Sequence, residues 1–299
     1  MLQNELMNSI AILCSPSDIG VRRNKGRNGA RFAPSGIIAS LKKLNAHHLE
    51  KSINYKLIDV TKQETEASDF HQAQDTSSSQ IKEILLNSSY HFKVHLGGGH
   101  DHAYPLLKAI DESKKYDQII IINIDAHCDT RIDDQRHSGT PFRDFDQLAP
   151  KTPTSMIQYG LHHFSNSVST MSPLKHVKER KTLLSEVANR TAQFTKRDER
   201  VLEDIKSLLT SKTALFFSLD ADAIDGSQMP AVSAPNPEGF PFAFIKSLLI
   251  QLQESFLLDA KQKAELDLYL GIYEYNPVYD TRAATAAKML ATLIYELEA

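Results

Sequence analysis

The sequence predicts an α/β protein in which a mainly parallel sheet of eight strands lies between layers of helices. Short apolar runs alternate with segments whose apolar residues recur at helical spacing, and this alternation is typical of a parallel sheet covered on both faces. The run at 119–122 consists of four isoleucines, which indicates a strand buried on both of its faces. The expected strands are 9–14, 55–60, 90–96, 119–122, 154–161, 182–187, 214–218 and 266–272.

The helices expected between these strands follow from apolar residues spaced three or four positions apart. Pro34 opens the first of them, and Ile37, Ile38 and Leu41 would form its buried stripe. Residues 61–80 are polar and contain three consecutive serines, so this stretch is expected to be a loop before the next helix. The remaining expected helices are a segment around 81–85, then 106–116, 194–211, 244–256 and 281–297.

Length and composition favour one globular domain over residues 1–299. With 299 residues, of which 41% are hydrophobic and 24% charged, the chain fits a single large α/β domain. Its formal net charge of −3 provides no basic field, which argues against nucleic acid or an anionic membrane surface as a partner.

The cysteine content and the N-terminus predict a cytoplasmic protein. Cys14 and Cys128 are the only cysteines, so a disulfide framework is excluded and a reducing compartment fits. The first residues lack the basic segment and the long apolar run of a secretory signal. No apolar run approaches the ~20 residues that a membrane-spanning helix needs, and no membrane association is expected.

The isoleucine run leads into side chains that bind metal ions well. Asp125, His127 and Asp129 follow it at alternate positions, so in an extended chain their side chains would share one face. Considered alone, this stretch is explained about equally well by a polar turn that caps a strand.

Two further strand ends repeat this pattern. Asp220 and Asp222 follow the strand at 214–218, and His100 follows three glycines after the strand at 90–96. Four carboxylates brought together repel one another unless cations compensate them, and two divalent ions would supply four positive charges. Oxygen and imidazole ligands without thiolate suit Mn(II) and, less specifically, Fe, Co, Ni or Zn. The six candidate ligands are His100, Asp125, His127, Asp129, Asp220 and Asp222.

These ligands stand in three motifs: Gly-Gly-His at 98–100, Asn-x-Asp-Ala-His-x-Asp at 123–129 and Ser-x-Asp-x-Asp-x-x-Asp at 218–225. In this order, and complete, the motifs resemble the signatures of the ureohydrolase family, which includes arginases, agmatinases and formimidoylglutamases. The resemblance runs from about residue 20 to the C-terminal helix. It implies the arginase-type three-layer α/β/α fold, a centre of two Mn²⁺ ions per subunit, and a homo-oligomer, either a trimer or a hexamer.

The resemblance also implies a role for each ligand. Asp125 and Asp220 would bridge the two ions. The other ligands would complete the two shells, His100 and Asp129 at one ion and His127 and Asp222 at the other.

Glu274 stands in a Glu-x-Asn-Pro motif that resembles the family's site for the amidine or guanidine cation of a small-molecule substrate. A carboxylate complements a planar N–C–N group, which donates paired hydrogen bonds. A surface acid at a strand end is the alternative. The implied mechanism is attack on the amidine carbon by a hydroxide that bridges the two Mn ions. Asp129 would accept the water's proton and deliver it to the leaving nitrogen.

Segments at 22–30, 138–142 and 232–237 look like those of formimidoylglutamases. The resemblance implies hydrolysis of N-formimidoyl-L-glutamate to L-glutamate and formamide, a step of histidine degradation. Arg131 is a candidate for binding a substrate carboxylate, and a plain salt bridge explains it equally well. Ser138 is a second candidate for binding substrate.

Other functions stay open at the level of the sequence. One is an arginase, agmatinase or other guanidino-acid hydrolase. A mononuclear zinc deacetylase of the same fold is another, although the intact set of six ligands argues against it. From a different class, the chain could be a non-catalytic regulatory protein that binds metal. The sequence does not decide the role of His137 or of the arginine-rich loop at 22–27.

Overall fold

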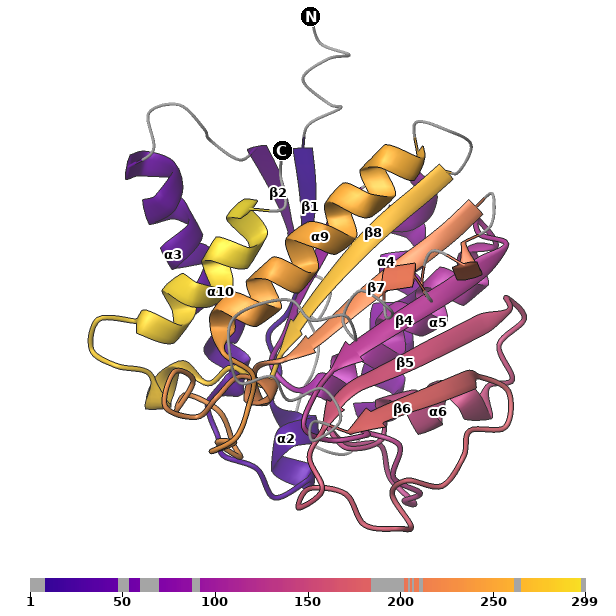
Figure 1. Cartoon of the computed structure of the whole chain (residues 1–299), viewed down its shortest axis with the longest axis horizontal. Helices are drawn as coiled ribbons and strands as arrows, with labels where there is room; N and C mark the ends of the chain where they lie inside the picture. Colours follow the sequence, from indigo (N-terminus) through magenta and orange to yellow (C-terminus); the bar gives the residue numbers. More distant parts are fainter. Residues whose placement is uncertain are drawn as a thin grey trace, which may run out of the picture.

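The central feature of the computed structural model is one sheet of eight strands (Figure 1). The structure describes residues 9–47, 54–59, 70–87, 92–183, 202–203, 205, 207–209, 212–260 and 265–296. The strand order is β2-β1-β3-β8-β7-β4-β5-β6, and every neighbouring pair is parallel. The bounds are β1 Ser9–Ser15, β2 Asn54–Asp59, β3 Phe92–Gly97, β4 Gln118–Ile124, β5 Thr154–Leu161, β6 Lys178–Leu183, β7 Lys212–Asp220 and β8 Glu265–Tyr273.

Helices cover both faces of this sheet, which confirms the predicted α/β/α layers. The helices α3, α9 and α10 lie over one face, and α4, α5 and α6 lie over the other (Figure 1). The bounds of the helices are α2 Ile19–Arg23, α3 Ala33–His47, α4 Phe70–Asn87, α5 Ala103–Ser113, α6 Pro141–Gln147, α9 Phe242–Ala260 and α10 Thr285–Glu296. Short 3-10 helices occupy η1 Ala30–Phe32, η2 His100–His102, η3 Ala221–Ala223 and η4 Pro277–Tyr279.

The isoleucine run in β4 is buried on both faces, as predicted. Ile120 and Ile122 belong to the core beneath α3, α9 and α10, whereas Ile119 and Ile121 belong to the core beneath α4 and α5. All four are fully buried. Because burying one such side chain stabilises the fold by about 1.5–3 kcal/mol, β4 anchors the middle of the molecule and fixes where the following residues emerge.

The sixth strand begins earlier than the sequence predicts. As described, it spans Lys178–Leu183, and residues 184–187 of the predicted strand at 182–187 lie outside the described residues. It pairs in parallel with β5 at the edge of the sheet. Its sequence, Lys-Glu-Arg-Lys-Thr-Leu, is mostly charged, so it lacks the apolar signal of a strand. Charged side chains are typical of edge strands, where they discourage pairing with other chains.

The expected loop at 61–80 is corrected over residues 70–80, which belong to α4 and include the three serines. Residues 61–69 lie outside the described residues. Gln74, Ser77 and Ser78 are buried on the face of α4 that meets α5. Polar residues that face another helix give no apolar stripe, which is why the periodicity misses this helical turn.

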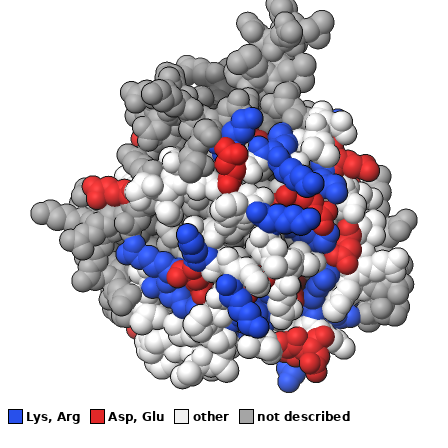
Figure 2. All heavy atoms as spheres, turned by 90° about the vertical axis from the view of Figure 1, so that its right-hand side faces the viewer, with Lys and Arg blue, Asp and Glu red and all other residues white. Residues whose placement is uncertain are grey.

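The helix predicted at 194–211 lies largely outside the described residues. Of that range, Leu202 and Ile205 are buried in the core beneath α3, α9 and α10. Within the described ranges, no helix is long and apolar enough to cross a membrane. On the face shown in Figure 2, Lys and Arg side chains are interspersed with Asp and Glu.

Candidate metal centre

The candidate site lies beyond the carboxyl ends of four adjacent strands in the middle of the sheet. The strands β3, β8, β7 and β4 are neighbours, and their ends deliver His100, Glu274, Asp220 and Asp125, respectively. Carboxyl ends of parallel strands meet at one edge, where α/β proteins bind their ligands. The topology therefore brings together side chains that are up to 174 residues apart in the sequence.

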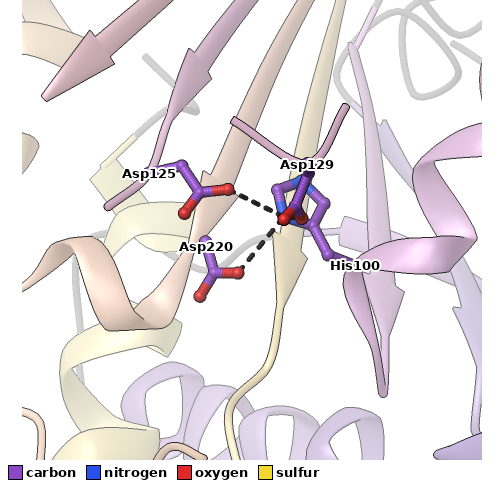
Figure 3. Close-up of side chains that lie close together, drawn as sticks. All are labelled: His100, Asp125, Asp129 and Asp220. Carbon is purple, nitrogen blue, oxygen red and sulfur yellow. Dashed lines mark hydrogen bonds and ion pairs between the residues drawn. The ribbon is translucent and has the colours of Figure 1, made fainter. Parts of the chain in front are cut away.

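The first group of candidate ligands surrounds the imidazole of His100 (Figure 3). Its Nδ1 atom lies 3.2 Å from Asp125 Oδ2, 3.0 Å from Asp129 Oδ2 and 3.2 Å from Asp220 Oδ2. All four residues are buried, and one potential ligand atom from each lies within 4.8 Å of the others. This spacing suits one metal ion held between three carboxylates and one imidazole.

The second group consists of Asp125, His127 and Asp222. The Nδ1 atom of His127 lies 3.2 Å from Asp222 Oδ2 and 3.5 Å from Asp125 Oδ1. Asp125 therefore belongs to both groups, with one carboxylate oxygen facing each of them. Asp220 belongs to the first group, and its Oδ1 accepts a hydrogen bond from the backbone N–H of Asp222 at 2.8 Å.

Together the two groups contain all six predicted ligands, but the ligands after β4 do not share a strand face. The strand ends at Ile124. The carboxylate of Asp125 then accepts the N–H of His127 at 2.7 Å, and Asp129 adopts a left-handed backbone with φ of 51°. The expectation of one extended face is wrong, because this turn sends Asp129 to the first group and His127 to the second.

Two side chains that sequence reasoning missed hold this turn in place. Gln158 of β5 donates to the carbonyl of Cys128 at 2.7 Å. Asn166 accepts the N–H of Cys128 at 2.8 Å and donates to the carbonyl of Ala126 at 2.9 Å. Neither residue follows a strand as part of a motif, so only the spatial neighbourhood reveals this role.

The ring of His100 is oriented from several sides. Its Nε2 lies 2.8 Å from Ser218 Oγ, so Nδ1 is left to face the carboxylates. Tyr273 stacks on the ring at 4.9 Å between centroids, and Phe142 meets it edge-on at 5.4 Å. Partners of this kind fix the tautomer and direction of a metal-binding histidine.

The acids of the two groups differ in how the chain balances their charge. Burial alone would raise the pKa of Asp125, but hydrogen bonds and charges from His100 and His127 lower it. Burial, followed by the charges of Asp222 and Asp125, raises the pKa of Asp220 well above its ordinary value. Burial alone would lower the pKa of His100, but its hydrogen bonds to the three carboxylates raise it well above the usual range. The pKa of His127 is raised as well, because the charge of Asp222 and the contacts with Asp125 outweigh burial.

Glu274 lies beside the two groups and is buried. Its N–H donates to the carbonyl of Gly98 at 2.9 Å, and its Oε1 accepts the N–H of His100 at 3.1 Å. The backbone of Glu274 has φ of 62°, an uncommon conformation that recurs at functional sites. Burial, followed by the nearby acids, raises its pKa to about 8. The position predicted for the substrate's cation is thus an internal carboxylate rather than a surface acid.

Arg131 and Ser138 lie together, joined by a residue the sequence did not single out. The Nη1 of Arg131 donates to Asn24 Oδ1 at 2.5 Å, and Asn24 Nδ2 donates to Ser138 Oγ at 3.0 Å. Within the described ranges, Arg131 has no carboxylate at salt-bridge distance. The plain salt bridge is therefore not observed there.

His137 and the arginine-rich loop make structural contacts. His137 Nε2 lies 3.1 Å from Asp133 Oδ2, and its Nδ1 accepts the N–H of Gly139. Arg22 Nε lies 3.3 Å from Asp18 Oδ1, and Arg27 donates to the carbonyl of Val232 at 3.2 Å. These contacts place the loop against the segments that surround the site.

The donor set fits divalent metal ions. Asp222 Oδ1 is buried and has no hydrogen-bond partner among the described residues. The acids of both groups meet only imidazoles as positive partners in the described chain. Carboxylates and imidazoles without thiolate favour hard or borderline divalent cations.

The parallel α/β/α fold and these two overlapping groups define an α/β protein with a candidate binuclear metal site. The model of the arginase family matches residues 8–298, and the chain belongs to that family. It is 29% identical over 294 residues to a formimidoylglutamase of Klebsiella pneumoniae, covering 96% of this chain and 85% of that one. A second Klebsiella pneumoniae formimidoylglutamase is 30% identical over 296 residues, with the same coverage.

Solved structures share the fold. A Bacillus subtilis formimidoylglutamase superposes with a TM-score of 0.76 at 20% identity, covering 97% of this chain and 86% of that one. A Trypanosoma cruzi formiminoglutamase described with Mn²⁺ gives a TM-score of 0.70 at 23% identity, covering 98% and 93%. The predicted arginase-like fold is confirmed.

Proposed function

We propose that this arginase-family protein hydrolyses N-formimidoyl-L-glutamate. One water is consumed, the C–N bond to the α-nitrogen breaks, and L-glutamate and formamide are released. The curated relatives named formimidoylglutamase support this substrate. The observation that carries the proposal is that two groups of acids and imidazoles share Asp125 beside the buried carboxylate of Glu274.

Two Mn(II) ions are the proposed cofactor. Asp125 and Asp220 would bridge them, and the remaining four ligands would complete the two shells. Bound divalent ions supply positive charge and a water molecule whose pKa is lowered toward neutrality. The overlap of the two groups at Asp125 supports the sharing of that acid, and the unpartnered Oδ1 of Asp222 supports a second ion. The bridging role of Asp220, which lies in the first group alone, rests on the family resemblance.

Glu274 would bind the cationic amidine. A planar N–C–N group donates two parallel hydrogen bonds, and an ionised carboxylate accepts both. The contact between Glu274 Oε1 and the backbone N–H of His100 holds the carboxylate in one orientation. A bound amidinium would also stabilise the ionised form of Glu274, which burial disfavours.

Asp129 would move the proton. It belongs to the first group, and its side chain is 9% exposed. A carboxylate in this position accepts a proton as the nucleophile attacks and returns it as the C–N bond breaks. The left-handed turn at Asp129 aims the side chain into the site.

Arg131 and Ser138 would bind a substrate carboxylate. Both are held next to the turn that contains Asp129, because the N–H of Arg131 donates to the carbonyl of Gly139 and the N–H of Phe142 donates to that of Asp129. The single domain over 1–299, the cytoplasmic location and the trimer or hexamer stay predictions.

The test is product analysis on protein stripped of metal and reloaded with Mn(II). N-formimidoyl-L-glutamate, L-arginine and agmatine would be offered separately. We expect formamide and L-glutamate from the first and little urea from the others. Urea from arginine or agmatine would overturn the substrate while leaving the site in place. No turnover of any of the three would contradict the proposed activity.

A further inference from the structure

Asn24 occupies a defined position between the two residues proposed to bind the substrate's carboxylate. It follows the last residue of α2, and its N–H donates to the carbonyl of Gly20 at 3.0 Å. Its side chain accepts from Arg131 Nη1 and donates to Ser138 Oγ. A guanidinium can only donate, so the amide oxygen must face Arg131 and the amide nitrogen must face Ser138.

This arrangement determines which hydrogen-bond donors remain available. Ser138 Oγ accepts the N–H of Asn24, so its own hydrogen is left to donate elsewhere. The Arg131 guanidinium uses one N–H on Asn24 and keeps the others. Among the described residues no carboxylate lies at salt-bridge distance from it, and the exposed Asp133 interacts with its charge only from farther away. Asn24 thus leaves a hydroxyl donor and a cationic donor side by side.

The backbone fixes the same three segments against one another. The N–H of Ser138 donates to the carbonyl of Gly20 at 3.2 Å, and the N–H of Arg131 donates to the carbonyl of Gly139 at 3.0 Å. Ser138 is buried and Arg131 is half-buried. Because the main chain already holds these segments, the side chain of Asn24 is not required merely to tether them.

We propose that Asn24 is a positioning residue that sets specificity for substrates with a carboxylate. It acts by keeping Ser138 as a donor and by holding the guanidinium of Arg131 without neutralising it. The inference rests on the proposed function, since that function supplies the carboxylate to be recognised. A neutral amide is the side chain this role needs, because it can accept from Arg131 and donate to Ser138 at once.

Two variants separate this role from a structural one. Asn24→Asp keeps the bond to Arg131 and strengthens it with a negative charge, but it cancels the cation and turns the Ser138 hydroxyl toward itself. Asn24→Ala removes both hydrogen bonds without adding charge. A tether would be harmed more by Ala than by Asp, whereas a specificity role is harmed more by Asp.

Asn28→Asp is the matched control. Asn28 lies in the same loop and is exposed, and its backbone carbonyl is what Asn276 contacts. This variant adds the same charge nearby without touching Arg131 or Ser138. We expect it to behave like the unmodified protein in every assay.

The experiment uses Mn(II)-loaded protein and measures three quantities: the Kd for L-glutamate by calorimetry, the kinetics on N-formimidoyl-L-glutamate, and hydrolysis of or inhibition by formamidine, which lacks a carboxylate. For Asn24→Asp we expect Kd and KM to rise by at least ~10-fold, the scale of a charged hydrogen bond. We expect kcat within about 3-fold, unchanged behaviour toward formamidine, and a smaller loss for Asn24→Ala.

The proposal is overturned if Asn24→Asp is milder than Asn24→Ala, if it matches Asn28→Asp, or if formamidine is affected in parallel. It is also overturned if the unmodified protein binds no L-glutamate. If the unmodified protein binds L-glutamate with the expected order of variants but hydrolyses no N-formimidoyl-L-glutamate, the role of Asn24 stands and the proposed function fails.

Discussion

Two clusters of charged side chains lie at opposite ends of the central strands of the sheet, and they differ in how their charge is balanced. Near the amino ends of β3 and β8, Lys93 Nζ lies 3.0 Å from Asp267 Oδ2, and Tyr116 donates to the same carboxylate. Beyond the carboxyl ends of β3, β7 and β4, the acids of the candidate metal centre face one another with only His100 and His127 as positive partners among the described residues.

The difference distinguishes a structural cluster from a functional one. At the amino edge, the cation and the anion come from the chain itself, so the cluster is complete when the protein folds. At the carboxyl ends of the strands, burial and the neighbouring carboxylates raise the pKa values of Asp129 and Asp220, whereas His100 and His127 lower the pKa of Asp125. Such a cluster is costly to fold unless an external cation binds, and perturbed groups of this kind concentrate at functional sites.

Removing the acid shared by both ligand groups should have the largest effect. We expect Asp125→Asn to reduce hydrolysis by ~1000-fold or more, since changes outside the metal shell already cost about 10–100-fold. Rates would be measured at saturating Mn(II). Asp134→Asn, an exposed acid in the following loop, is the control and should retain full activity. Full turnover in Asp125→Asn would show that the assigned site is wrong.

Neutralising the carboxylate of Glu274, which is proposed to bind the substrate's amidine, should have the next largest effect. We expect Glu274→Gln to lower kcat/KM by about 10–100-fold, the value of a charge-assisted hydrogen bond, while Mn(II) content stays unchanged. Steady-state kinetics and metal analysis would check this. Glu83→Gln, on the exposed face of α4, should change neither quantity. Loss of metal in Glu274→Gln would instead place this residue among the ligands.

Near the amino ends of β3 and β8, a substitution should change the stability of the protein and leave metal binding unchanged. Lys93→Met leaves the carboxylate of Asp267 without its main cation, and breaking a buried pair on one side costs about 3–5 kcal/mol of unfolding free energy. Lys82→Met breaks a half-exposed pair with Glu112 at 3.2 Å, which is worth at most ~1 kcal/mol. Denaturant unfolding would compare the two. Equal losses would contradict the structural role of Lys93.

The smallest expected effect is the change with pH in the difference in unfolding free energy between the unmodified protein and Lys93→Met. Burial alone would raise the pKa of Asp267, but the charge of Lys93 and the hydrogen bonds from Tyr116 and Lys93 lower it. A lowered pKa contributes stability above the unfolded value of about 3.9, and this is lost as pH falls through the folded value. The gap between the unmodified protein and Lys93→Met should therefore be full at pH 6 and shrink toward pH 3. If this difference in unfolding free energy instead grew as pH fell, the assigned direction of the Asp267 pKa shift would be wrong.

Much of the fold could be predicted from the sequence because its strands are apolar and its ligands follow them. The isoleucines of β4 are buried on both faces, and the glycines before His100 and the acids after β7 stand where parallel strands end. A buried parallel strand has a strong local signal, and the position of its end is part of that signal.

What the sequence could not show depends on partners distant along the chain. The first turns of α4 are polar because they face α5, and β6 is charged because it is an edge strand. Asn24 meets Arg131 and Ser138 across more than a hundred residues. No local pattern encodes such contacts, because tertiary packing alone selects them.

The central claim is that Asp125, which belongs to both ligand groups, is shared by two metal ions. The most direct test is the number of Mn(II) ions bound per chain, measured by calorimetry and metal analysis on the unmodified protein, Asp222→Asn and Asp125→Asn. We expect two ions in the unmodified protein, one tightly bound ion in Asp222→Asn and none tightly bound in Asp125→Asn. Two tightly bound ions in Asp125→Asn would contradict the claim.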